Sequence, residues 1–202
     1  MLIRDQDCDE DPDRWRAFLA DQGFGHFVAV GRDRLVPVVV PTQFVLTDTE
    51  IVFHLVNTNP VFAALEENPN ALMSVAGDWA YIPGKWKAIG DEDPALGIPT
   101  TYYAAVQVTG ECTLQSDPDD IASVLTTQLD ALEPGHEYVD PTEHAARLRQ
   151  IRAIRMSIGG VRVKYKYGGN VDQDHRDAVA DRLTQRDGPG DRAALEHLRR
   201  TR

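Results

Sequence analysis

The sequence has few cysteines and lacks the motifs of the common enzyme classes. Its 202 residues include two cysteines, Cys8 and Cys112, which lie far apart and outside any CxxC pair. A disulfide framework or a zinc site therefore has little support. The six histidines are not spaced as metal ligands, and we expect no metal centre. No P-loop, GxSxG, HExxH or GxGxxG motif occurs, which removes the usual grounds for assigning an ATPase, an α/β-hydrolase, a zinc protease or a Rossmann dehydrogenase.

The chain also has no apolar run of the ~20 residues that a membrane-spanning helix needs. Its amino-terminal segment, MLIRDQDCDEDPDRW, is acidic, whereas a secretion signal begins basic and then turns apolar. We therefore expect a cytoplasmic protein with no membrane partner. A hydrophobic content of 42% with mixed charge is typical of a folded protein.

Basic residues are scarce and unevenly placed. The chain has 21 Lys and Arg against 32 Asp and Glu, a net charge of −11. Residues 144–171 contain no acid, and this segment holds Arg147, Arg149, Arg152, Arg155, Arg162, Lys164 and Lys166. A protein that binds duplex DNA nonspecifically needs a broad basic face, and no helix-turn-helix pattern is present. The distribution favours a small anionic ligand, and we do not expect direct DNA binding without a partner.

The pattern of apolar residues and turns predicts an α+β fold, a small antiparallel β-barrel with peripheral helices. Pro37 and Pro41 indicate that the second strand is an edge or is bulged. A Gly- and Pro-rich stretch, 84–99, is expected to be a loop. Strands are predicted at 24–30, 35–47, 51–56, 71–83, 101–115 and 152–168, and helices at 12–22, 61–68, 119–133, 141–151 and 171–183. Residues 1–183 form the expected domain, and 184–202 a polar terminal helix or tail.

The first candidate site is the segment HLVNTNPVFAAL, residues 54–65. It places His54, Asn57, Thr58 and Asn59 at a junction between a strand and a helix. Unpaired N–H groups at a helix start attract anions. The alternative is structural: Asn59 caps the helix and Asn57 forms an Asx turn.

Aromatic residues with neighbouring lysines form the second candidate. Lys85 and Lys87 lie among Trp79, Tyr81, Trp86, Tyr102 and Tyr103. Such a set suits a flat, electron-poor or anionic ring, although a core edge or a subunit interface would use the same residues.

The third candidate is the segment KYKYGGN. Strand alternation places Lys164 and Lys166 together on one exposed face, beside a Gly168-Gly169-Asn170 turn whose backbone can approach a ligand closely. The alternative is that the two lysines only form a solvated face.

In this order the three segments resemble the PaiB-like FMN-binding proteins, described as negative transcriptional regulators. The resemblance runs from about Leu2 to Leu183, and its most specific parts are IPTTYYAAVQVTG and the KxKxxxN turn. It implies a six-stranded antiparallel split β-barrel of the flavin-reductase type, a homodimer, and FMN in the groove between subunits. The residues that it places at the cofactor are His54, Asn57, Thr58, Asn59, Tyr81, Thr100, Thr101, Tyr102, Lys164, Lys166 and Asn170.

The sequence departs from the family pattern at three places, one of which is Thr101-Tyr102, where Trp-Asn is usual before the tyrosine. Val38 and Val39 stand where a polar Thr-His pair is usual, and Gly168-Gly169 replaces a polar pair of the final turn. A deazaflavin or haem is therefore an alternative to FMN. The function expected is a flavin-dependent oxidoreductase or a PaiB-like regulator. The alternatives are a regulatory binding protein without catalysis and a haem-binding relative, with His26 or His54 as axial ligand. No catalytic residue is indicated.

Overall fold

The computed structural model describes residues 1–201, which form two compact units. Unit 1 contains residues 1–11, 76–106 and the chain from 163 onward. Unit 2 contains residues 12–75 and 107–162. Within the described chain no helix combines the length and apolarity needed to cross a membrane. Over the same residues, no three His, Cys, Asp or Glu side chains are grouped so that they could hold a metal ion.

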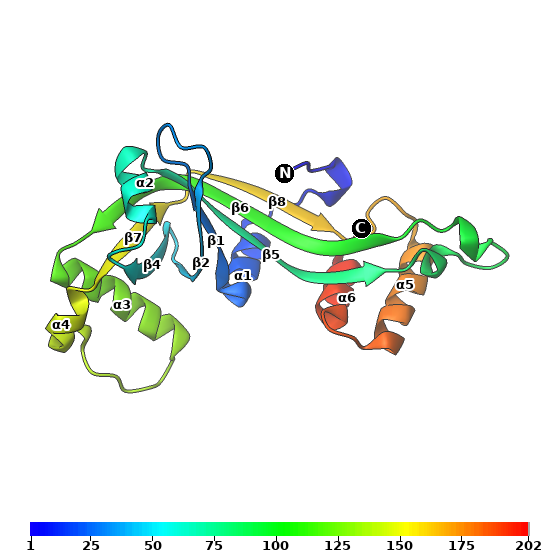
Figure 1. The fold of residues 1–202 in the computed structure, drawn as a ribbon. Coiled ribbons are helices and arrows are strands. Elements are labelled where there is room, and N and C mark those ends of the chain that lie inside the picture. Colours follow the sequence, from blue (N-terminus) through cyan, green and yellow to red (C-terminus); the bar gives the residue numbers. More distant parts are fainter. Residues whose placement is uncertain (202) are drawn as a thin grey trace. The chain divides into compact units, whose positions relative to one another are not determined.

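The strands confirm the α+β class (Figure 1). They are β1 (Phe24–Ala29), β2 (Val38–Gln43), β3 (Val45–Leu46), β4 (Glu50–Val56), β5 (Asn70–Ile82), β6 (Thr100–Gln115), β7 (Ile151–Ser157) and β8 (Gly160–Lys166). Their order is β2-β1-β5-β6-β7-β4-β3, and β8 pairs with β6. The resolved registers of β1 with β2 and β5, and of β7 with β4 and β6, are antiparallel. Strands β5, β6 and β8 have residues in both units.

The sheet has eight strands where six were expected, because two predicted strands are each divided. The segment 35–47 breaks at Phe44, whose N–H bonds to the carbonyl of Gly23. The segment 152–168 breaks after Ser157, and the N–H of Gly159 bonds to Thr109 O. The expected edge position is confirmed: β2, which contains Pro41, ends the strand order.

Unit 2 carries α1 (Pro12–Gln22), α2 (Val61–Glu67), α3 (Pro118–Leu132) and α4 (Ala145–Leu148). Helix α3 packs against β4 and β7 (Figure 1). Ile121 and Val124 of this helix share a buried cluster with Val52 and Ala153 of the strands. The helix predicted at 141–151 is shorter, because it starts as a 3-10 turn at Pro141–His144 and β7 begins at Ile151.

Unit 1 carries α5 (Gln173–Arg186) and α6 (Asp191–Arg200), which pack together. Its loop 84–99 contains two 3-10 turns, at Gly84–Lys87 and Pro94–Leu96. The terminal segment is helical and docked, since Leu195 and Leu198 are buried. The Arg186 Nε donates to Asp191 at 2.7 Å and links the two helices. The boundary placed at residue 183 stays a prediction.

Candidate functional site

A group of cations lies around Tyr103 in unit 1. The Lys166 ammonium donates to Thr100 Oγ1 at 2.8 Å and lies 5.9 Å from the centre of the Tyr103 ring. Lys87, on the 3-10 turn of the loop, is close enough for the charge of Lys166 to act on it. We call Lys87, Thr100, Tyr103 and Lys166 the lysine cluster. Thr100 and Lys166 are thus two predicted site residues that the structure brings into contact.

The two ammonium groups of the lysine cluster repel each other. Burial lowers the pKa of Lys87, and the positive charge of Lys166 lowers it further. Neither lysine has an ion pair with a carboxylate among residues 1–201. Two partly buried like charges without a counter-charge are an unfavourable arrangement that a bound anion would relieve. This pair is the strongest electrostatic signal for a ligand in unit 1.

Lys164 differs from the exposed lysine that strand alternation predicted. Lys164 is only 9% exposed, because the amino-terminal segment covers this face of β8. The Lys164 ammonium donates to Leu2 O at 2.9 Å and lies 3.8 Å from Asp7 Oδ2. It also lies 5.5 Å from the Tyr103 ring centre. Leu2 and Asp7 therefore bind the Lys164 ammonium group, which was expected to face solvent.

The glycine turn after β8 is also approached by the protein itself. A Cβ on Gly169 would lie 2.5 Å from Gln6 O, and one on Gly168 would lie 2.5 Å from the Tyr102 hydroxyl. Tyr102 is buried, and burial raises its pKa to about 12. These close approaches explain the two glycines without a ligand. Asn170 is exposed at the end of the turn.

Tyr81 and Thr101 complete the predicted residues of unit 1. Tyr81 is half exposed on β5, on the same face as the exposed Trp79. Thr101 is partly buried next to Thr100 on β6.

The predicted residues of unit 2 are mostly engaged in local structure. Asn59 Oδ1 accepts from the N–H of Val61, and Asn57 Nδ2 donates to Arg149 O. Helix α2 has only seven residues, and Asn59 already pairs its first N–H. Thr58 is exposed in the turn between them.

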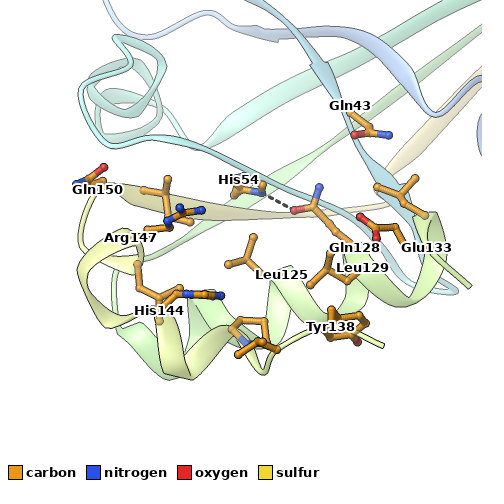
Figure 2. A pocket seen from close by; sticks show the side chains of 15 residues that line it. Gln43, His54, Leu125, Gln128, Leu129, Glu133, Tyr138, His144, Arg147 and Gln150 are labelled. Carbon is orange, nitrogen blue, oxygen red and sulfur yellow. Dashed lines mark hydrogen bonds between the residues drawn. The ribbon is translucent and has the colours of Figure 1, made fainter. Parts of the chain in front are cut away.

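His54 lines a separate cavity of about 720 Å³ in unit 2 (Figure 2). Its Nδ1 lies 2.7 Å from Gln128 Oε1 of α3. Because an amide oxygen only accepts hydrogen bonds, this His54 nitrogen carries the proton. The other wall residues are Gln43, Leu125, Leu129, Leu132, Glu133, Tyr138, Val139, Pro141, His144, Arg147, Leu148, Gln150 and Ile151.

Sequence reasoning missed several of these residues. Lys87 was noted beside the aromatics, but nothing local placed it near Lys166. Gln128 carried a usable signal, because it falls on the buried stripe of α3 that contains Ile121 and Val124. A polar residue on such a stripe needs a hydrogen-bond partner. Arg147 carried no sequence signal other than its positive charge.

Comparison with protein families gives one match over most of the chain. Residues 1–164 match the model of the family described as "Putative FMN-binding domain". No curated protein matches the sequence.

Solved structures share the fold at low sequence identity. The flavocytochrome Anf3 from Azotobacter vinelandii is 20% identical with a TM-score of 0.63, covering 82% of this chain and 72% of that one. The FAD and heme binding protein from Mycobacterium smegmatis is 19% identical with a TM-score of 0.62, covering 86% and 78%. The conserved hypothetical protein Rv2991 from Mycobacterium tuberculosis is 12% identical with a TM-score of 0.59, covering 86% and 95%.

Proposed function

The chain belongs to the family described as "Putative FMN-binding domain", and on this premise we propose that it binds a flavin nucleotide, FMN first among them. The observation that carries the proposal is the pair of ammonium groups on Lys87 and Lys166. In a protein of net charge −11, a partly buried like-charge pair is expected where an anion binds. Two proteins with a similar fold, a flavocytochrome and an FAD and heme binding protein, support a flavin.

In this proposal the flavin phosphate lies at the lysine cluster. A phosphate monoester carries close to two negative charges at neutral pH, which would neutralise both ammonium groups. Thr100 Oγ1 already accepts from Lys166, so its own hydroxyl proton is available to a phosphate oxygen. Lys164 contributes only through the electrostatic field, because Leu2 and Asp7 hold its ammonium group.

The isoalloxazine ring would lie on the neighbouring aromatic and hydroxyl side chains. Tyr81 presents a half-exposed ring, and Thr101 follows Thr100 on β6. Tyr102, the next residue of β6, is buried and its ring packs against Tyr167. We leave His54, Asn57 and Asn59 out of the proposed site, because each side chain already has a hydrogen bond within unit 2.

We also propose that the protein acts as a homodimer. Trp79 is 61% exposed and Tyr81 is 50% exposed on one face of β5, and a second copy would cover these rings. Sedimentation velocity at micromolar concentration tests this. A stable monomer in the presence of FMN would remove the dimer from the proposal.

Bound flavin supplies hydride or electron transfer, and the protein's part is to hold and orient it. An oxidoreductase is therefore the first form of the proposal. The alternative is a PaiB-like regulator in which flavin acts as a signal without catalysis. In a further alternative the bound ligand is haem or a deazaflavin and not FMN. The visible absorption spectrum of the freshly purified protein separates these ligands directly.

The phosphate assignment is tested by titrating FMN and riboflavin, which lacks the phosphate, into Lys87→Met and Lys166→Met variants. Each substitution removes one charged contact, so FMN affinity should fall roughly ten- to a hundred-fold while riboflavin affinity changes little. Both variants should fold, because each removes one member of a repelling pair. Lys85→Met, an exposed neighbour, is the control. Equal affinity of all variants for FMN would place the phosphate elsewhere.

A further inference from the structure

The cavity beside α3 has the size and wall chemistry of a small-molecule site. Its volume of about 720 Å³ falls within the usual range of roughly 300–1,000 Å³ for ligand pockets. Leu125, Leu129, Leu148 and Ile151 line it, so much of the wall is apolar. Figure 2 shows Arg147 and Gln150 at one end and Glu133 and Tyr138 at the other, with His54 and Gln128 between them.

The Arg147 end of the cavity is electropositive and without a counter-charge. The Arg147 guanidinium has no hydrogen bond or ion pair with any residue of the described chain, 1–201. His144, on the preceding turn, lines the same end. At the opposite end, Glu133 Oε2 lies 3.7 Å from His136 Nδ1. A guanidinium fork fits a carboxylate through two parallel hydrogen bonds.

Gln128 adds a hydrogen-bond donor at the centre of the cavity. The residue is 6% exposed, and its Oε1 accepts from His54 Nδ1 at 2.7 Å. Its amide nitrogen has no hydrogen-bond partner within residues 1–201. The nitrogen itself is not fully buried, so it can donate to an acceptor on a ligand in the cavity.

We propose that this cavity binds a small amphipathic carboxylate, an aliphatic or aromatic monocarboxylic acid. The carboxylate pairs with Arg147, and the apolar body packs against Leu125, Leu129 and Leu148. An oxygen on the ligand accepts from the Gln128 amide. The site is separate from the proposed flavin site, whose lysine cluster belongs to the other compact unit.

Isothermal titration calorimetry on the full chain tests the proposal with sodium octanoate and with octanamide, its uncharged analogue. Wild-type protein should bind octanoate at least ten-fold more tightly than octanamide. Arg147→Met should lose this preference, with octanoate affinity falling roughly ten- to a hundred-fold. Arg149→Met is the matched control, because this exposed arginine lies two residues away and does not line the cavity. Both arginines are exposed, so both variants should keep the wild-type circular dichroism spectrum.

Four results would overturn the proposal: no binding at about 1 mM octanoate, equal affinity for octanamide, an unchanged Arg147→Met variant, or an equal loss in Arg149→Met. Two competition arms separate the cavity from the cofactor. Saturating FMN should leave octanoate binding unchanged, and displacement by FMN would assign the cavity to the flavin. In the second arm hemin is added and its Soret absorption band is measured. A shift of this band in the wild type that is absent in His54→Ala would assign the cavity to haem. Failure of FMN binding alone leaves the carboxylate site intact.

Discussion

Lys164→Met tests the buried contact between the amino-terminal segment and β8. The side chains of Lys164 and Asp7 are 11% and 7% exposed, and their charged atoms lie 3.8 Å apart. The ammonium group also donates to Leu2 O at 2.9 Å. Methionine keeps most of the aliphatic stem and removes the charge and all three donors. The substitution therefore isolates the polar part of the contact.

The expected cost follows from two losses. A hydrogen bond from a charged donor contributes about 1.5–3 kcal/mol, and a buried charge left without its partner costs about 3–5 kcal/mol. The two do not add fully, because residues 2–7 can separate from β8 and return Asp7 to water. We expect a loss of about 2–4 kcal/mol, which lowers the Tm of a chain of this size by roughly 5–15 °C.

Urea unfolding followed by circular dichroism measures this loss, and hydrogen exchange reports on residues 2–7. Adding Asp7→Asn to Lys164→Met should restore part of the stability, because the unpaired carboxylate is gone. Lys85→Met is the control and should stay within about 0.5 kcal/mol of wild type. If Lys164→Met also stays within that margin, the reasoning about the buried pair is wrong.

Two further predictions concern unit 1. His175 Nδ1 lies 2.7 Å from Asp172 Oδ1, and its Nε2 lies 3.1 Å from Glu92 Oε2. Hydrogen bonds to these two carboxylates raise the pKa of His175 above 6.5, and Asp172 makes the larger contribution. The stabilisation is complete below pH 6.5 and is lost as the pH rises through the higher folded pKa. Glu92 also accepts from the N–H of Ile89 at 3.0 Å, so hydrogen exchange at Ile89 should increase over that pH range relative to a His175→Phe variant. Parallel pH profiles of the two proteins would contradict this. Gly169→Ala should destabilise by about 1–3 kcal/mol because its Cβ meets Gln6 O, whereas urea curves matching those of Asn170→Ala, an exposed control, would refute the clash.

Local signals were enough to predict most helices and strands. Asp11-Pro12 and Gly23 bracket α1, and the side chain of Asp117 caps α3 by accepting from Asp119 N at 2.9 Å. Such capping signals act within a few residues, so they can be recognised from the sequence alone. The two divided strands escaped prediction because the breaks depend on Phe44 and Gly159 bonding to distant backbone groups.

The candidate site was less predictable, because its chemistry depends on residues distant in sequence. Alternation correctly paired Lys164 and Lys166 on one face of β8, but it carried no information on what covers that face. The structure places Leu2 and Asp7 over Lys164 and Lys87 near Lys166. The amino-terminal segment therefore binds one lysine, and the other is the one that we propose for the phosphate, a difference that the sequence pattern does not encode.

The contact between Leu2 and Lys164 also has a consequence for synthesis of the chain. Its two residues are 162 positions apart in sequence. Lys164 of β8 is therefore synthesised long after the amino-terminal segment, which cannot make this contact while the middle of the protein is being made. Docking of this segment is thus a late step of folding. Until then the acidic residues that flank it keep it solvated, which lowers the chance that it pairs with a wrong strand.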